Sequence, residues 1–172
     1  MIHVEKVTHI DLKQLTPEPT PAEFPKATAS KLASETTVCV DFESLTPGQK
    51  ISSALKLKNA QFCIFPEGII VQAVLPDDPQ QRLYLGLSGS GYIQICFPKA
   101  KRVDLYLVNQ GGSHLRVDFL DKGGTPRGNP SFVEPMNVVE HVPYIDKGSV
   151  YGIRINVTNT ECLIWRLCYL PK

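Results

Sequence analysis

The sequence predicts an all-β protein, an antiparallel sandwich of two packed β-sheets. From residue 36 onward, short apolar runs with period-two alternation follow one another, turn residues separate them, and no amphipathic helical pattern interrupts them. Because there are about ten such runs, two packed sheets account for them better than one open sheet. The chain has 172 residues, enough for one such domain with a full core.

The strands are expected in quick succession along the chain, each bounded by turn-forming residues. The expected ranges are 36–43, 54–58, 61–65, 68–75, 82–87, three central runs between 92 and 120, then 137–142, 150–157 and 162–170. The segment GLSGSG at 86–91 is predicted to be a hairpin turn. A phosphate loop is excluded because strands flank it on both sides and no helix N-terminus is available for the anion.

The three central runs share one apolar face, which we predict to be buried. Its members are Ile93, Ile95, Phe97, Val103, Leu105, Leu107, Leu115, Val117 and Phe119. The loop 109–113 is expected to close a hairpin between the second and third runs, with Leu107 opposite Leu115.

The polar face of this expected hairpin carries a pair of like charges. In the same register Tyr106 faces Arg116, and Asp104 faces Asp118. Two carboxylates directly opposite each other are destabilising, so a positive group must neutralise them. Arg116 is the expected countercharge, because two carboxylates supply too few oxygens for calcium; a cation held by both carboxylates is the alternative.

Residues 1–35 are predicted to form an extended, Pro-rich N-terminal arm, and residues 36–172 the sandwich domain. Prolines at 17, 19, 21 and 25 favour extended structure. A disordered tail is the other interpretation. Apolar residues near the start of the arm are candidates for docking on a neighbouring subunit: Ile2, Val4, Val7, Ile10, Leu12 and Leu15.

Charge and cysteine usage exclude several classes of function. The net charge is +1, from 18 basic and 17 acidic residues, so charge alone recruits neither nucleic acid nor an anionic membrane. No apolar run is long enough to span a bilayer, and the N-terminus lacks signal-peptide features, so we expect a cytoplasmic location or release within a larger particle. The five cysteines are widely spaced and without a CxxC pair, so all are expected to be reduced. No metal and no cofactor is expected.

Three segments resemble the galactose-binding-like jelly-roll domains, including bacterial surface-protein adhesion domains. They are VDFESLTPGQKI at 40–51, RVDLYLVNQGGSHLRVDFLDKGG at 102–124 and YGIRINVTNTECLIWRLCYL at 151–170. The resemblance implies a jelly-roll fold, sugar binding or adhesion, and a structural calcium near the first strand. Where such domains commonly have an acidic residue in the last strand, this chain has Trp165 and Arg166. Calcium at Asp41 and Glu43 is therefore not expected, and Arg166 is the candidate to replace it.

The polar face of the central hairpin is the candidate surface for a ligand or partner. It combines aromatic rings with forked hydrogen-bonding groups, as sugar and protein recognition both do. Its residues are Tyr92, Asp104, Tyr106, His114, Arg116 and Asp118. An ordinary solvated sheet face is the other interpretation. Trp165 is expected in the core, because its run is strongly apolar.

The primary functional prediction is a non-enzymatic structural or assembly module that docks on neighbouring protein subunits, including its own copies, through the arm and a sheet face. The alternative is a carbohydrate-binding module, lectin-like or adhesive. No enzyme is expected, because histidines and carboxylates do not form a catalytic constellation in the sequence. Nucleic acid and membrane insertion are not expected.

Overall fold

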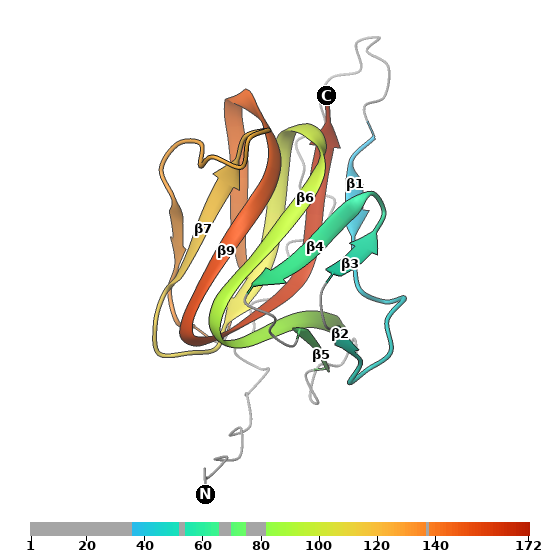
Figure 1. Cartoon of the computed structure of the whole chain (residues 1–172), viewed down its shortest axis with the longest axis vertical. Helices are drawn as coiled ribbons and strands as arrows, with labels where there is room; N and C mark the ends of the chain where they lie inside the picture. The colour runs from blue at the N-terminus through green and yellow to red at the C-terminus, as the bar shows by residue number, and fades with distance from the viewer. Residues whose placement is uncertain (1–35, 52–53, 66–69, 75–81, 137) are drawn as a thin grey trace, which may run out of the picture.

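The computed structural model describes residues 36–51, 54–65, 70–74, 82–136 and 138–172, and within them every regular element is a β-strand (Figure 1). The strands are β1 (Val38–Val40), β2 (Lys50–Ile51), β3 (Ala54–Leu57), β4 (Ala60–Phe65), β5 (Ile70–Val74), β6 (Leu83–Asn109), β7 (Leu115–Leu120), β8 (Ser131–Val133) and β9 (Glu140–Pro171). This part of the chain contains no helix that could cross a membrane. The expected arm, with its docking residues, lies outside the described residues.

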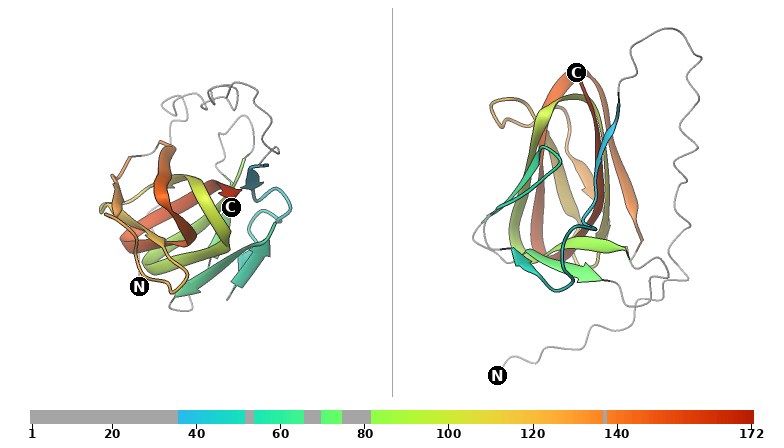
Figure 2. Two further views of the ribbon diagram at one scale, coloured as in Figure 1. Left: turned by 90° about the horizontal axis from the view of Figure 1, so that it is seen from above. Right: turned by 90° about the vertical axis from the view of Figure 1, so that its right-hand side faces the viewer.

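The strands form two packed layers, which Figure 2 shows from above and from the side. The front sheet, facing the viewer in Figure 1, is β3, β4, residues 91–96 of β6, residues 152–157 of β9, β7 and β8, in that order of pairing. The back sheet consists of residues 140–150 of β9, residues 100–109 of β6 and residues 160–171 of β9, in that order of pairing. Along the other side of this last segment lie β1 and residues 83–89 of β6, and β5 and then β2 follow beyond residues 83–89. All pairs are antiparallel, so the predicted all-β, two-sheet sandwich is confirmed.

The two long strands β6 and β9 contribute to both layers. After pairing with β4 in the front sheet, β6 continues into the back sheet beyond residue 97. Strand β9 starts in the back sheet, crosses to the front at residues 150–152 and returns before Cys162. The layers are therefore joined by continuous backbone as well as by the core between them.

The core lies between the sheets and contains the apolar face predicted from the alternation. All nine predicted core residues are buried in one cluster. Two aromatic pairs connect the layers: Phe97 stacks on Tyr169 with ring centroids 5.2 Å apart, and Phe119 lies 4.7 Å from Tyr144. This part of the sequence prediction is confirmed.

The predicted hairpin between the second and third central runs is wrong. Residues 100–109 lie in the back sheet, while β7 pairs with β8 and β9 in the front sheet. The loop between them crosses from one sheet to the other, and the buried side chain of Asn109 holds it. The Asn109 amide donates to the carbonyls of Ser113 and Val133 at 2.9 Å each, and its oxygen accepts from Thr160 Oγ1 at 2.8 Å. With no hairpin, the expected contact between Asp104 and Asp118 does not exist.

The segment GLSGSG is not a hairpin turn either, because β6 runs through it. Ser88 and Gly89 pair with Glu161 and Thr160, and pairing resumes with a shifted register at Gly91. Gly89 has φ of 102° and Gly91 has φ of 153°, values that residues with a Cβ rarely adopt. The glycines let the strand bend between the layers without ending.

A disulfide joins Cys39 to Cys168 and corrects the expectation of five reduced cysteines. The two residues face each other directly where β1 pairs with the last part of β9. Their separation of 129 residues explains why local spacing gave no signal. Cys63, Cys96 and Cys162 are free thiols.

Candidate functional site

A row of five side chains crosses the outer face of the front sheet at one level, and we call it the front ladder. It consists of Phe65, Tyr92, Asn156, Arg116 and Phe132, which come from β4, β6, β9, β7 and β8. Each is the direct cross-strand partner of the next. Because side chains alternate along a strand, the apolar neighbours of these residues point into the core, and the ladder points outward.

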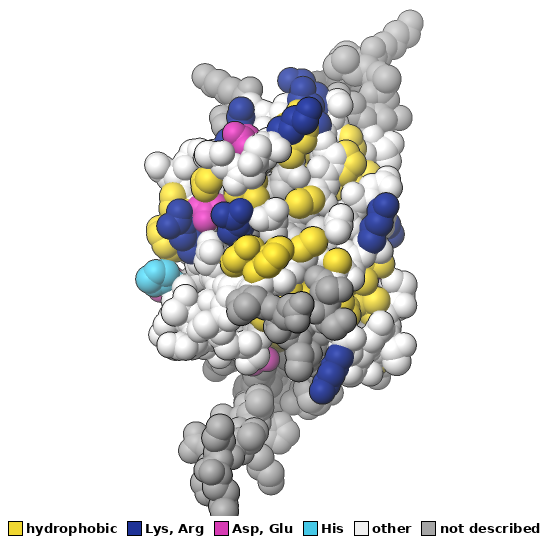
Figure 3. Space-filling view, viewed as in Figure 1, with side chains coloured by type: hydrophobic (Ala, Val, Ile, Leu, Met, Phe, Trp, Pro, Cys, Tyr) yellow, Lys and Arg dark blue, Asp and Glu magenta, His cyan; other side chains and the backbone are white. Residues whose placement is uncertain are grey.

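Aromatic rings occupy both ends of the front ladder. Phe65 stacks on Tyr92 at 4.8 Å, and Phe132 makes an edge contact with His114 at 5.1 Å. Phe65 is 44% exposed and Phe132 is 53% exposed, values high for large apolar side chains. Figure 3 shows hydrophobic side chains in a band across this face. The face therefore offers apolar planes to solvent at two separated points.

Polar groups fill the middle of the face around a buried carboxylate. Asp118 is only 4% exposed and accepts from Arg116 Nη2 at 3.0 Å and from Asn156 Nδ2 at 3.1 Å. One level away, Arg154 lies over the Tyr92 ring at 5.3 Å and donates to Gln94 Oε1 at 2.9 Å. In Figure 3 basic and acidic side chains adjoin over β7 and β9. These hydrogen bonds hold the side chains of Arg116, Asn156 and Arg154 in fixed orientations, so their other N–H groups point in defined directions.

The outer face of the back sheet carries a second cluster, built around Asp104. Asp104 is 3% exposed; it accepts from Arg102 Nε at 2.9 Å and lies 2.8 Å from His141 Nε2. The His141 ring stacks on Tyr106 at 4.7 Å. Burial, and secondly the nearby Asp104 carboxylate, raises the pKa of Tyr106 above its ordinary value. Like an unperturbed tyrosine, Tyr106 keeps its hydroxyl proton at neutral pH.

Trp165 belongs to this back cluster and is not in the core as expected. Tyr106 pairs with Arg166 and Leu107 with Ile164, so Trp165 is the extra residue of a β-bulge. The bulge brings Trp165 to the outer face, where it is half-buried and makes an edge contact with Tyr106 at 5.6 Å. Arg82 and Arg166 lie over its ring at 5.0 and 5.8 Å. Protein groups thus already cover the ring surfaces of this cluster.

The structure divides the predicted surface residues between the two faces. Tyr92, His114, Arg116 and Asp118 lie on the front face, whereas Asp104 and Tyr106 lie on the back. The expected single surface is therefore wrong, because the loop 109–113 crosses between sheets.

Sequence reasoning also missed residues of the front face: Phe65, Phe132, Arg154 and Asn156. A usable signal existed for the two phenylalanines, since the alternation in β4 and β8 gives them the parity opposite to the buried Ile64 and Val133.

The expected countercharge for Asp41 is also corrected. Lys58 Nζ lies 3.0 Å from Asp41 Oδ2 and 3.1 Å from the carbonyl oxygen of Cys39, so lysine and not Arg166 neutralises this carboxylate. Lys58 has φ of 43° in the tight turn between β3 and β4, which aims its side chain back at β1.

The front face has the chemistry of a binding surface for hydroxyl-rich ligands. Rings at its ends provide apolar planes, and the guanidinium, amide and carboxylate groups between them provide directed donors and acceptors. Among the described residues, no group of three or more His, Cys, Asp or Glu side chains could hold a metal ion.

No protein-family model matches the chain, and no curated protein is similar to it in sequence. Solved structures are similar in fold. A family 61 carbohydrate-binding module in complex with β-1,4-galactotriose has a TM-score of 0.45 at 11% identity, covering 77% of this chain and 94% of its own. A xylan-binding module of family 86 from Roseburia intestinalis has a TM-score of 0.41 at 7% identity, covering 80% and 96%. A family 29 module in complex with mannohexaose has a TM-score of 0.42 at 9% identity, covering 78% and 90%.

These similarities concern the fold, which is the predicted all-β sandwich. They run against the primary functional prediction, because the three structures named above are carbohydrate-binding modules and not assembly modules. The arm on which the assembly reading depended lies outside the described residues.

Proposed function

We propose that the protein is a non-catalytic carbohydrate-binding module whose site is the outer face of the front sheet. The observation that carries the proposal is the front ladder, with exposed aromatic rings at both ends and polar groups between them. Sugars present apolar C–H faces as well as hydroxyl groups, and this arrangement matches both kinds of surface.

The dimensions of the ladder favour an extended glycan over a single terminal sugar. Its five residues come from five neighbouring strands, and strands in a sheet lie about 4.8 Å apart, so the ladder spans about 19 Å. The polysaccharide chain would run across the strands, with sugar rings on Phe65 and Phe132. Hydroxyl groups between them would bond to Asn156 and Arg116.

Asp118 organises the site without needing to touch the sugar. Because it is buried and accepts from both Arg116 and Asn156, it holds their side chains in one orientation before a ligand arrives. Such preorganisation lowers the entropy lost on binding.

The disulfide supports an oxidising location for this activity. Bridges such as Cys39–Cys168 persist in extracellular and periplasmic proteins and are rare in the cytosol. We therefore favour an oxidising compartment over the cytoplasm, consistent with contact with polysaccharides outside the cell.

The test is a glycan array followed by calorimetric titration with the best soluble oligosaccharide. Phe65→Ala and Phe132→Ala should each weaken binding about tenfold or more, equal to about 1.4 kcal/mol. Ile145→Ala is the matched control, because Ile145 is 74% exposed and its strand segment lies in the back sheet, so binding should be unchanged. The absence of any glycan hit, or equal affinity in all three variants, contradicts the proposal.

A further inference from the structure

The strands of the front sheet carry more positive than negative charge. They contain three basic residues, Lys56, Arg116 and Arg154, and one acidic residue, Asp118. Arg116 forms an ion pair with Asp118, so these two charges compensate each other. Lys56 is exposed on β3, at the side of the sheet. The excess positive charge of this face therefore belongs to Lys56 and Arg154.

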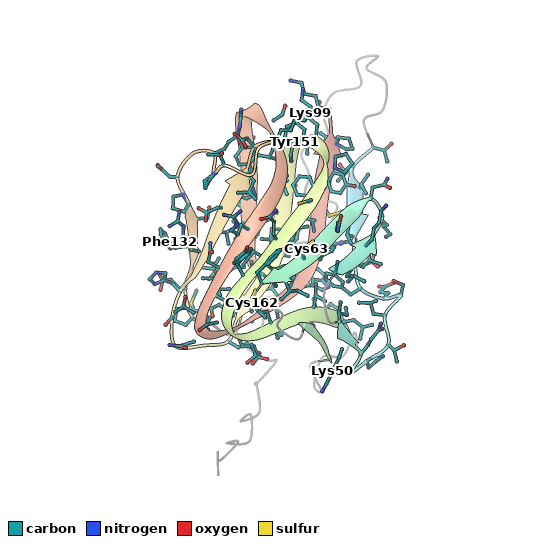
Figure 4. All side chains as sticks on the ribbon, in the orientation of Figure 1. Lys50, Cys63, Lys99, Phe132, Tyr151 and Cys162 are labelled. Carbon is teal, nitrogen blue, oxygen red and sulfur yellow. A yellow bond between two sulfur atoms is a disulfide. The ribbon has the colours of Figure 1, made fainter. Side chains whose placement is uncertain are left out.

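Arg154 lies in the middle of the front face. It is on β9, one level from the front ladder and directly opposite Gln94 of β6. Figure 4 shows the two sides of this face, with Cys63 on β4 and Phe132 on β8, and β9 runs between them. The guanidinium carbon of Arg154 lies 5.3 Å from the centre of the Tyr92 ring. A sugar seated at the Tyr92 end of the ladder would therefore lie beside this charge.

The guanidinium of Arg154 lacks an anionic partner. Its Nη2 donates to Gln94 Oε1 at 2.9 Å, but its buried Nε has no hydrogen-bond partner among the residues that the structure describes. Within the same part of the chain, Arg154 makes no ion pair. Arg116 shows the arrangement that is missing, because its Nε and Nη2 donate to the Asp118 carboxylate at 3.1 and 3.0 Å. In Arg154 one neutral oxygen serves this pair of donors, so an anionic acceptor would add a hydrogen bond and compensate the charge.

We propose that the glycan bound on the front face is acidic and that Arg154 binds its carboxylate or sulfate group. This inference rests on the proposed function and names the class of glycan. The Nε and Nη2 donors match two oxygens of one anionic group, whereas a sugar hydroxyl offers a single oxygen and no charge. Gln94 can give way to the anion, because its other hydrogen bond goes to Cys96 Sγ at 3.6 Å, and sulfur is a weak acceptor.

The test compares matched pairs of glycans that differ only in charge. An array carries uronic-acid oligosaccharides beside their methyl esters, and sulfated oligosaccharides beside their desulfated forms. The pair with the strongest signal is then titrated by calorimetry. Its acidic member should bind the wild type about tenfold or more tightly than the neutral member, and the difference should shrink as salt rises. The chemistry of that pair tells a carboxylate ligand from a sulfate ligand.

Two variants ask whether Arg154 selects the acidic glycan. Arg154→Gln should remove the preference for the acidic member and keep the binding of the neutral one. Gln94→Glu leaves the arginine in place but supplies a carboxylate from the protein itself, so it should also remove the preference. Arg166→Gln is the matched control, because Arg166 lies over Trp165 in the back cluster, and it should keep the preference. Circular dichroism melting of each variant verifies its fold.

The possible failures of this inference and of the proposed function differ. Equal affinity for the acidic and neutral members of every pair overturns the inference and leaves the proposed function standing. A preference that persists in both Arg154→Gln and Gln94→Glu overturns it as well. No binding of any glycan, acidic or neutral, overturns the proposed function and this inference together.

Discussion

Asp104 and Asp118 show how this chain accommodates buried charge at the scale of single residues. Each carboxylate is bonded to the arginine two positions earlier, in Arg102-Val-Asp104 and Arg116-Val-Asp118. Because residues i and i+2 of a strand share a face, the repeated Arg-Val-Asp triplet neutralises each aspartate locally. Arg116 was predicted to neutralise Asp104 and Asp118 as a facing pair. It does neutralise Asp118, but the two aspartates never face each other, because they lie on opposite faces of the sandwich.

Removal of the Arg116 guanidinium should therefore destabilise the fold. Arg116→Ala leaves Asp118 buried with Asn156 as its remaining partner, at a cost of about 1–3 kcal/mol. Urea unfolding at neutral pH measures this loss, and stability should not respond to a chelator. An unchanged midpoint would show that solvent replaces the arginine.

Thiol reactivity should separate the three free cysteines. With a pKa of about 12, raised mainly by burial, Cys162 forms almost no thiolate at pH 8.5. Iodoacetamide at that pH should alkylate Cys96 and Cys63 and leave Cys162 unmodified in the native protein, as peptide mass spectrometry can show. Folding raises the pKa of Cys162 from its ordinary value of 9.0 to about 12, so the folded state favours the protonated thiol. The folded state is therefore fully stable with respect to this group below pH 9, and it loses stability as the pH rises from 9 toward 12. Equal labelling of all three thiols would mean that the layers open readily.

At the scale of elements, strand β7 of the front sheet packs against the back sheet through the buried ring of Phe119, which contacts Tyr144. Phe119→Ala should cost about 3–5 kcal/mol, because it leaves a cavity against Tyr144. Phe132→Ala on the adjacent strand β8 removes the same ring from an exposed position and should change stability by less than about 0.5 kcal/mol. Denaturant titrations of the two variants compare them directly. Similar losses in both would contradict the assignment of faces.

The elements also show what sequence reasoning can and cannot reach. Period-two alternation identified the buried face correctly in β6 and β7, because each residue's environment follows from its parity alone. The partner of each strand does not follow from parity. A five-residue loop such as 109–113 can close a hairpin or cross between sheets, and the choice depends on Asn109 bonding to Val133, 24 residues away.

The candidate site was accordingly only half predicted. Tyr92 and Arg116 were identified from the central runs, but their ladder neighbours Phe65, Asn156 and Phe132 come from strands far along the chain. Such a row can be predicted only when the order of the strands in the sheet is known. The bulge that exposes Trp165 likewise has no local signature in an apolar run.

At the scale of the whole molecule, the disulfide closes almost all of the described chain into one loop. Loss of the bridge in Cys39→Ala/Cys168→Ala should lower stability by about 2–4 kcal/mol, chiefly because the unfolded chain gains freedom. Thermal melting with and without reductant measures the effect; reductant should lower the Tm of the wild type and leave the double variant unaffected. A melting temperature equal in the two proteins would mean that the pairing of β1 with β9 suffices alone.

The same bridge determines how the molecule carries tension. Both ends of the described chain leave at one end of the sandwich, beside the bridged strands (Figure 1). A pull on the flanking segments enters at Cys39 and leaves at Cys168 through a covalent bond, so the 129-residue span between them bears none of it. If the front face binds a glycan as proposed, a force between that glycan and a flanking segment would instead act on the front sheet. The bridge would then shield the fold from a force along the chain, but not from a force applied through the bound ligand.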